Sequence, residues 1–337
     1  MSHIRPIWRC LLIATVLATL ALVTTLTACY LAYTRSPEAP TLSTGPNAAW
    51  FAHEWVGAEQ SDERYSELAA RLTDNRIVDA YFHVGPLQAD GTIAPGRYRA
   101  ATRLLRELYS GAPAIRPQAW IGQVEKSGGG PLDLSRAEVR TVIVATAARF
   151  LDLGFAGIHV NIEPSTGNPH LLELLAEIRD RTAQRRATLS IAADELEPIA
   201  GIAWLTRVAG TRAGFWTEAY YRAVLARVDQ VAVMMYDTGL PTDWLYGALV
   251  KWQTAAIRAI AGPGVTVYIG VPTYEERRLS FHPGAENMRT ALRGIRQGLH
   301  DVPPGARARF GVAIYADWTT DDAEWRQYRA NWLGISP

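Results

Sequence analysis

The chain has 337 residues, of which 48% are hydrophobic and 20% are charged, and its formal net charge is +1. This length can bury a large core, as one large domain or two small ones, and the charge balance gives no reason to expect a nucleic-acid partner. Both cysteines, Cys10 and Cys29, lie near the N-terminus. A disulfide framework and a cysteine-based zinc site are therefore excluded for the rest of the chain.

The N-terminal segment has the composition of a membrane-targeting sequence. Arg5 and Arg9 precede an uncharged run over residues 10–34. Leu26-Thr27-Ala28-Cys29 resembles a bacterial lipobox, which would make Cys29 a lipidation site. The alternative is an uncleaved transmembrane anchor, because about 20 apolar residues suffice to span a bilayer. Since the basic residues precede the run, both alternatives tether the following domain to a membrane, on the extracytoplasmic (periplasmic or cell-surface) side.

Three regions follow from these patterns. Residues 1–34 form the anchor segment, and residues 35–47, which are rich in proline, serine and threonine, form a linker. Residues 48–337 form the folded domain.

In that domain, short β-like runs alternate with amphipathic helical runs. The patterns predict strands at Ala49–Trp55, Ile77–Leu87, Arg116–Val124, Gly154–Pro164, Thr188–Glu195, Gln230–Asp237, Val265–Tyr274 and Arg309–Trp318. They predict helices at Asp62–Thr73, Gly96–Tyr109, Ser135–Leu153, Asn168–Arg186, Thr217–Arg227, Asp243–Ala261, Ala285–Leu299 and Asp321–Trp332. The helix from Ser135 begins with Ser135-Arg136-Ala137-Glu138, the pattern of a capping box.

Alternating strands and helices predict an α/β fold with a parallel sheet, and eight such units predict a closed (β/α)8 TIM barrel. One strand fewer would leave an open, doubly wound sheet. In such barrels the reactive groups lie where strands end and βα loops begin.

The fourth predicted strand carries the most informative side chains. Because strand side chains alternate between faces, His159, Asn161 and Glu163 share one face, at steps of roughly 6 to 7 Å. An imidazole, an amide and a carboxylate in one row are more typical of a reaction site than of a solvated surface. Other polar and aromatic residues stand at the ends of the predicted strands, as sugar-stacking sites often require: Trp55, His83, Trp120, Asp194, Glu195, Tyr236, Asp237, Tyr274, Glu275, Tyr315 and Trp318.

At these residues the sequence resembles the family 18 glycoside hydrolases, the chitinases. Their fourth strand carries D-G-x-D-x-D-x-E, and residues 156–163 here read AGIHVNIE. The glycine and the last glutamate match, whereas all three aspartates are replaced. Met234-Met235-Tyr236-Asp237 matches their sixth-strand M-x-Y-D, and Tyr315 takes the place of the eighth-strand tryptophan. Asn161 before Glu163 also resembles the N-x-E of the related family 85 endo-β-N-acetylglucosaminidases.

This resemblance implies hydrolysis assisted by the substrate's own 2-acetamido group, an exception to the two-carboxylate rule. Glu163 would be the general acid and then the base. Asn161 and Tyr236 would orient the acetamido group, and Asp237 would hold a sugar hydroxyl or assist them. His159 is expected to be neutral and hydrogen-bonded. The expected substrate-binding residues are His159, Trp55, His83, Trp120, Glu195, Tyr274, Tyr315 and Trp318.

Two other functions fit the sequence. In many barrel glycosidases an acid/base follows asparagine on the fourth strand and a nucleophilic glutamate ends the seventh, where Glu275 or Glu276 stands here. The third alternative is a barrel that binds glycan without cleaving it, which the replaced aspartates favour. No metal motif is present, and no cofactor is expected. The expected partners are a glycan and a membrane, and the sequence leaves the oligomeric state open.

Overall fold

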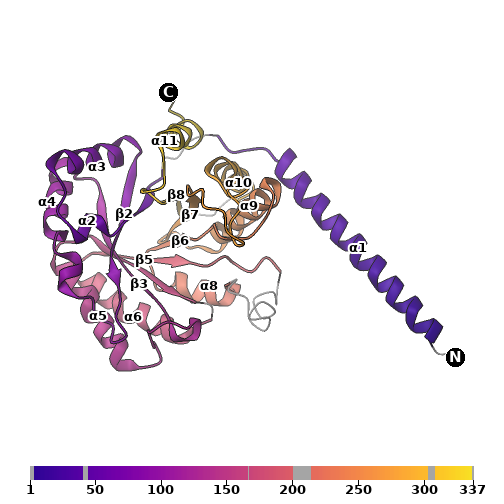
Figure 1. Ribbon diagram of the computed structural model, residues 1–337, viewed down its shortest axis with the longest axis horizontal. Coiled ribbons are helices and arrows are strands. Elements are labelled where there is room, and N and C mark those ends of the chain that lie inside the picture. The colour runs from indigo at the N-terminus through magenta and orange to yellow at the C-terminus, as the bar shows by residue number, and fades with distance from the viewer. Residues whose placement is uncertain (1–3, 41–44, 166, 200–213, 303–307, 336–337) are drawn as a thin grey trace.

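The computed structural model describes residues 4–40, 45–165, 167–199, 214–302 and 308–335. Parts of the predicted anchor (1–3), linker (41–44) and folded domain (166, 200–213, 303–307 and 336–337) lie outside the described residues. The described chain forms a closed barrel of eight parallel strands in the order β1 to β8, with β1 paired to β8 (Figure 1). The predicted TIM barrel is confirmed.

The strands alternate with helices on the outside of the barrel. The strands are β1 (Asn47–Phe51), β2 (Ile77–Pro86), β3 (Arg116–Val124), β4 (Gly157–Glu163), β5 (Thr188–Ala193), β6 (Gln230–Val233), β7 (Thr266–Pro272) and β8 (Arg309–Tyr315). The α-helices are α1 (Ile4–Arg35), α2 (Glu54–Gly57), α3 (Asp62–Asp74), α4 (Ala101–Gly111), α5 (Ala137–Asp152), α6 (Pro169–Gln184), α8 (Glu218–Leu225), α9 (Asp243–Ile260), α10 (Met288–His300) and α11 (Asp322–Tyr328).

Alternation along each strand divides the core into two parts. On β4, Ile158, Val160 and Ile162 are buried in the large apolar core that the strands share with the surrounding helices. The inward faces form a smaller cluster inside the barrel, made of Ala48, Trp50, Tyr81, Ala232, Tyr268, Ala313 and Ala316. Because apolar side chains fill the helix-facing side, the polar residues of β4 must point into the barrel.

Several predicted strand ends are wrong, because the chain leaves the sheet sooner than the apolar pattern suggests. β1 ends at Phe51, and Trp55 lies in α2. β6 ends at Val233, and the left-handed backbone at Asp237 (φ 59°) is incompatible with an extended strand. Likewise β5, β7 and β8 end before Glu195, Tyr274 and Trp318, which therefore stand on βα loops.

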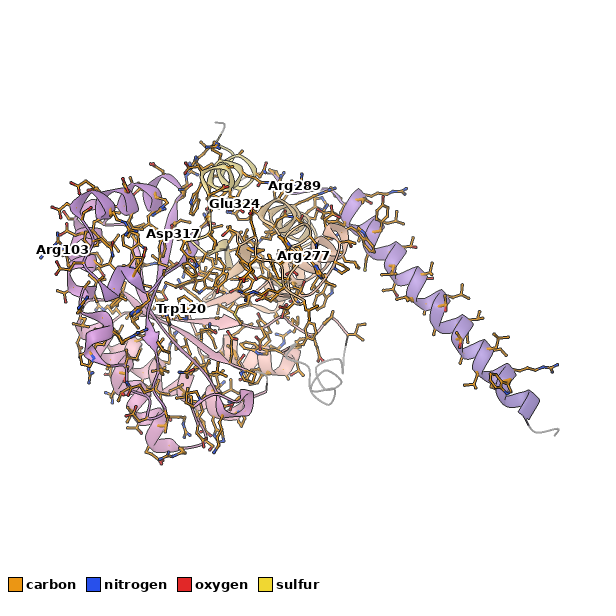
Figure 2. All side chains as sticks on the ribbon, viewed as in Figure 1. Arg103, Trp120, Arg277, Arg289, Asp317 and Glu324 are labelled. Carbon is orange, nitrogen blue, oxygen red and sulfur yellow. The ribbon has the colours of Figure 1, made fainter. Side chains whose placement is uncertain are left out.

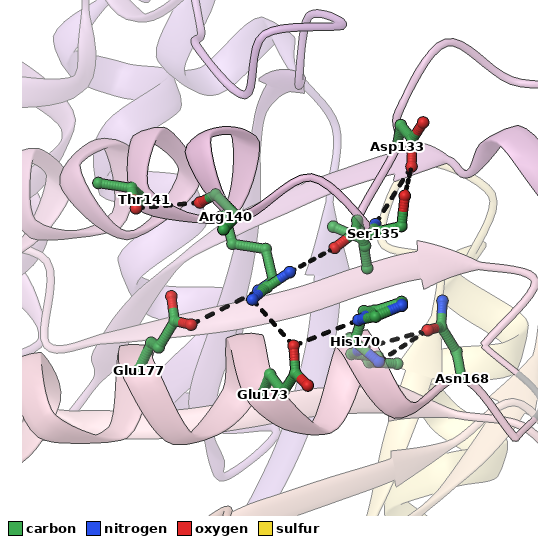
Figure 3. A network of polar contacts seen from close by, with 11 residues as sticks. Asp133, Ser135, Arg140, Thr141, Asn168, His170, Glu173 and Glu177 are labelled. Atoms are coloured by element: carbon green, nitrogen blue, oxygen red, sulfur yellow. Dashed lines mark hydrogen bonds and ion pairs between the residues drawn. The ribbon is translucent and has the colours of Figure 1, made fainter.

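The predicted capping box at Ser135 is also wrong. The Ser135 hydroxyl donates to Asp133 instead (2.5 Å), and α5 begins at Ala137 without a side-chain cap. Figure 3 shows what joins α5 to α6 near this point: Arg140 pairs with Glu173 (2.9 Å). Arg140 also donates to the carbonyl of Leu134, in the turn before α5 (2.8 Å). A short polar turn followed by an inter-helix ion pair replaces the local cap.

A fully buried carboxylate organises the N-terminal end of the barrel interior. Asp79 on β2 accepts two hydrogen bonds from Arg116 (2.9 and 2.7 Å) and one each from Gln118 and Gln230 (both 2.9 Å). The hydroxyl of Tyr268 donates to the same carboxylate. These groups come from β2, β3, β6 and β7, so one charge ties together strands on both sides of the barrel.

We expect Asp79→Ala to lower the free energy of unfolding by about 3–5 kcal/mol, because it removes the buried acceptor of the Arg116 ion pair and leaves the buried amide of Gln230 and the hydroxyl of Tyr268 without their acceptor. Urea unfolding of the full chain in detergent would measure this loss. Glu67→Ala, on the exposed surface of α3, is the control and should shift stability by no more than about 0.5 kcal/mol. Equal losses in the two variants would contradict the role given to Asp79.

Candidate active site

The floor of the site is a hydrogen-bonded imidazole inside the barrel. His159 on β4 is completely buried, and its Nε2 accepts a hydrogen bond from the indole N–H of Trp50 (3.0 Å). Its Nδ1 lies 2.9 Å from the hydroxyl of Ser190 on β5. The ring also stacks on Tyr81, with centroids 3.8 Å apart. Because an indole can only donate, Nε2 carries the lone pair and Nδ1 carries the proton.

Burial lowers the pKa of His159 to about 3, so the ring is neutral at ordinary pH. The expectation of a neutral, hydrogen-bonded His159 is confirmed. The predicted contact between this side chain and a substrate is corrected, because none of the ring is exposed. His159 instead supports the aromatic residues above it.

Above the floor, β4 presents Asn161 and then Glu163 at its C-terminal end. Pairing in register sets Asn161 opposite Gly122 and Glu163 opposite Val124 of β3. Glu163 is exposed, whereas Asn161 is half-buried and its Oδ1 has no hydrogen-bond partner among the described residues. The site thus offers an accessible carboxyl group beside an unused amide acceptor.

Glycines let the neighbouring backbone come close to this end of β4. A Cβ at Gly122 would lie 2.5 Å from the carbonyl oxygen of Asn161, and one at Gly128 would lie 2.5 Å from the ring of Pro164. The amide of Glu125 also donates to the carbonyl of Glu163 (2.6 Å). The glycine-rich loop after β3 therefore packs directly against the segment that holds Glu163.

An aromatic wall stands across from β4. Tyr236, after β6, stacks on Tyr315 at the end of β8, with centroids 4.4 Å apart and planes 16° apart. Tyr274 meets both rings edge-on, at 6.3 and 6.0 Å, and Trp318 meets Tyr315 edge-on at 5.9 Å. Since Trp318 is 47% exposed, the wall extends from the buried floor to solvent.

The carboxyl group of Glu163 is near enough to Tyr236 in this wall to act on its hydroxyl electrostatically. Burial raises the pKa of Tyr236 well above its ordinary value, and the nearby Tyr315 and Glu163 raise it further. The hydroxyl of Tyr236 therefore stays protonated and can donate a hydrogen bond throughout the neutral range.

On β2 and β3, His83 and Trp120 form a second aromatic pair with centroids 4.7 Å apart. Burial, followed by the charges of His53 and Arg97, lowers the pKa of His83 to about 4. Figure 2 shows Trp120 near the middle of the barrel, on β3. β2 and β3 lie two and three strands from β8 around the closed barrel, so these two predicted residues form a separate side of the mouth from Tyr315.

A third side of the mouth is acidic. Burial and then Asp194 raise the pKa of Glu195 to about 8, with smaller contributions from Glu286 and Asp237. Burial also raises the pKa of Glu286 to about 7, although this carboxylate accepts hydrogen bonds from the amides of Thr238 (3.0 Å) and His282 (3.4 Å). Two of these acids therefore hold protons near neutral pH.

Sequence reasoning missed two residues in this region. Glu286 lies just before α10, far from any strand end, so position along the chain gave no signal. Trp216 is fully buried and its indole donates to Asp194 (2.9 Å) and Ser165 (3.1 Å). It follows the segment 200–213, outside any predicted strand, and only its residue type could have drawn attention to it.

Of three further predicted positions, one lies away from this mouth and two are exposed on its rim. Trp55 is buried in α2 with Arg64 over its ring at 5.0 Å, so it belongs to the outer packing and its predicted sugar contact is corrected. Glu275 and Glu276 are both exposed on the loop after β7, and Glu276 pairs with Arg278. Among the described residues, no group of three or more histidine, cysteine, aspartate or glutamate side chains is arranged to hold a metal ion.

No protein-family model and no curated protein sequence matches this chain. Solved structures do match its fold. A chitinase from Chromobacterium violaceum and a class V chitinase from Pseudomonas fluorescens each align with a TM-score of 0.55 and 13% identity over 86% of this chain and 99% of theirs. The spore cortex-lytic enzyme SleL of Bacillus megaterium aligns with a TM-score of 0.53 and 12% identity, over 88% of this chain and 76% of its own.

At this level of identity, the likeness establishes a shared fold. The chitinase-like barrel that the two sequence motifs indicated is confirmed, and the likeness to family 85 stays a prediction. The first motif ends with β4, and Met234-Met235-Tyr236-Asp237 directly follows β6, so both motifs belong to the fourth and sixth strands in barrel order.

We expect His159 to remain neutral, with its proton on Nδ1, from pH 8 down to about pH 4. Nitrogen-15 NMR would report the tautomer, and a His159→Gln variant would assign its signals among the seven histidines. Because the folded-state pKa is lowered, stability from this group is complete above about pH 6.5. It falls by about 1.4 kcal/mol per pH unit as pH drops toward 3. Titration of His159 near pH 6.5 would contradict this assignment.

Proposed function

We propose that the protein is a membrane-tethered, extracytoplasmic glycoside hydrolase that cleaves N-acetylhexosamine-containing glycans by a substrate-assisted, retaining mechanism. The observation that carries the proposal is the arrangement at the end of β4. An exposed Glu163 follows a half-buried Asn161 whose Oδ1 has no described partner, and the protonated hydroxyl of Tyr236 lies near the Glu163 carboxyl group. The barrel it shares with two chitinases supports this chemistry.

In the first step Glu163 gives its proton to the glycosidic oxygen, and the bond from that oxygen to C1 breaks. The carbonyl oxygen of the sugar's 2-acetamido group attacks C1 from the other face and forms an oxazoline-like ring. The unused Oδ1 of Asn161 accepts the acetamido N–H, and the hydroxyl of Tyr236 donates to the acetamido oxygen. Both hydrogen bonds orient the nucleophile and stabilise charge that develops in the transition state.

In the second step the Glu163 carboxylate removes a proton from water as the water attacks C1. The oxazoline-like ring opens, the acetamido group is restored, and the product keeps the original configuration at C1. No protein nucleophile is needed, so one carboxyl group serves as acid and then as base. The stacked rings of Tyr236 and Tyr315 and the exposed Trp318 offer apolar faces to the sugar during both steps.

The tether in this proposal is α1. Its segment Trp8–Arg35 has 28 residues, and an 18-residue window within it has a mean hydropathy of 2.2 and is not buried against the barrel. By length and composition it could cross a bilayer. Arg5 and Arg9 at its start favour a cytoplasmic N-terminus, which assigns the barrel to the other side.

We expect Glu163→Gln to reduce hydrolysis of chitooligosaccharides by about 100- to 10,000-fold, because glutamine cannot transfer the proton. The full chain in detergent would be assayed, and Glu67→Gln on α3 is the control for a lost surface carboxylate. Glu163 is exposed, so the variant should unfold at the same urea concentration as the parent. Undiminished cleavage would remove Glu163 from the mechanism. Binding without cleavage by the parent chain would favour the non-catalytic alternative.

A thiazoline that mimics the oxazoline intermediate should inhibit hydrolysis competitively, because it occupies the space of the cyclised acetamido group. Glu275→Gln and Glu276→Gln should keep kcat within about threefold, since the Glu276 carboxylate is engaged with Arg278 and both side chains point to solvent. Loss of activity in either variant, together with insensitivity to the thiazoline, would favour the mechanism with a glutamate nucleophile after β7.

A further inference from the structure

The last turns of α1 lie along the outer helices of the barrel in a defined direction. Tyr30 meets Trp244 edge-on at 5.8 Å, and the ring of Tyr33 lies against Gly247, where a Cβ would be 2.1 Å from it. The Ser36 hydroxyl lies 2.6 Å from the ammonium of Lys251. In these three contacts the residue numbers increase along both segments, so α1 runs parallel to α9. The earlier residues of α1 therefore lie beyond the N-terminal end of α9.

That end of α9 lies at the catalytic face. In a (β/α)8 barrel each helix begins where the preceding strand ends, at the face that carries the active site. Trp244 is in the first turn of α9, just after the loop that carries Tyr236 and Asp237. The apolar part of α1 therefore approaches the barrel from the mouth side. Figure 1 shows α1 leaving the barrel beside α9 and α10, on the side toward which the arrow of β5 points.

Packing and polar contacts of Tyr33 and Glu38 fix the end of α1 against the barrel, and we call this contact the joint. Tyr33 is only 5% exposed, the guanidinium of Arg293 lies over its ring at 4.5 Å, and its carbonyl accepts a hydrogen bond from Gln297 (2.7 Å). Glu38 pairs with Arg296 (2.9 Å) and Arg293 (3.4 Å). The described start of the predicted linker is thus clamped to α10, and it cannot act as a flexible tether.

The rim of the mouth beside this joint suits a lipid surface. Leu279, on the loop after β7, has its side chain fully exposed. Arg277 and Arg289 are exposed and have no acidic partner among the described residues, and Figure 2 shows both on the flank of the barrel toward α1. The carbonyl of Ser280 accepts from the amide of Gly239, which joins this loop to the one carrying Asp237 (2.8 Å). An apolar tip flanked by unpaired guanidinium groups matches an anionic bilayer surface.

We propose that the docked α1 turns the mouth of the barrel toward the bilayer, with the loop around Leu279 at the head groups of anionic phospholipids. The substrate class that follows is an N-acetylhexosamine glycan carried on a membrane lipid; this part rests on the proposed function. The geometry is the same whether α1 spans the membrane or a lipid on Cys29 anchors the chain, because Cys29 immediately precedes Tyr30. The segment from Leu11 to Tyr30 has about twenty residues, which is the length needed to cross a hydrocarbon core.

The orientation can be measured without any enzymatic activity. In the full chain carrying Cys10→Ser and Cys29→Ser, single cysteines would be placed by Leu279→Cys or Gly264→Cys and labelled with an environment-sensitive fluorophore. Gly264 is exposed before β7, at the opposite end of the barrel, and a side chain there meets no neighbour. In vesicles of phosphatidylcholine and phosphatidylglycerol with quencher-labelled lipids, we expect at least threefold stronger quenching at position 279. Equal quenching, stronger quenching at 264, or none at either position would overturn the proposal.

A matched pair of glycine variants tests whether the joint sets the orientation. Gly247→Ala drives a methyl group into the ring of Tyr33, while alanine favours the helix itself. Gly262→Ala is the control, because a Cβ there meets nothing within 4 Å. The difference in quenching between positions 279 and 264 should shrink at least twofold in Gly247→Ala and persist in Gly262→Ala. An unchanged difference in Gly247→Ala would show that the joint does not orient the barrel.

A hydrolysis assay tests the proposed substrate class independently of the proposed function. In the same vesicles, we expect the chain to cleave a lipid-linked chitooligosaccharide at least tenfold faster than the free oligosaccharide at equal concentration, and Gly247→Ala to reduce this ratio. Equal rates would overturn the lipid-linked substrate class while leaving the glycosidase in place. Cleavage of neither substrate, with quenching as expected, would uphold the membrane-facing mouth and contradict the proposed function.

Discussion

The hydrogen bond from Trp50 to His159 fixes the centre of this barrel. An indole that must donate and an imidazole that must stay neutral meet where no water is available, and Ser190 takes up the other ring nitrogen. Because the ring cannot be charged at this depth, it provides a rigid, uncharged floor. Tyr81 stacks on the imidazole and Trp50 meets it edge-on, so aromatic rings surround the residue that precedes Asn161 and Glu163 on the inward face of β4.

Below His159, the strands are connected through the buried carboxylate of Asp79. Asp79 collects donors from three other strands, and its bidentate pair with Arg116 closes the N-terminal end of the barrel. The Asp79 network and the aromatic cluster around His159 are two layers of the barrel interior with different roles. The layer around Asp79 connects the strands through an ion pair whose carboxylate is fully hydrogen-bonded. In the layer above it, burial raises the pKa of Tyr236, so that its hydroxyl stays protonated near Glu163.

The position of α1 relative to the barrel is fixed by the segment that follows it. A flexible linker would let the mouth face any direction, whereas Tyr33 and Glu38 bind the chain to α9 and α10 before it reaches β1. The same helices begin at the loops that form the mouth. In the proposed orientation, one pair of neighbouring helices therefore sets both the direction of α1 and the access to the mouth, and a change in their packing would alter both.

The sequence by itself determined the alternation of strands and helices, the inward face of β4 and the apolar character of α1. These are periodic, local properties that need only neighbouring residues. It also indicated Glu163, Asn161, Tyr236 and Asp237, because strand ends in a parallel barrel meet at one face. Tertiary structure alone decided that His159 is sealed beneath the site, that Trp55 packs outside it, and that Glu286 joins it. Each of those outcomes depends on which distant strand or helix lies opposite the side chain, and the same holds for the clamped segment after α1, whose polar composition suggested a loose linker.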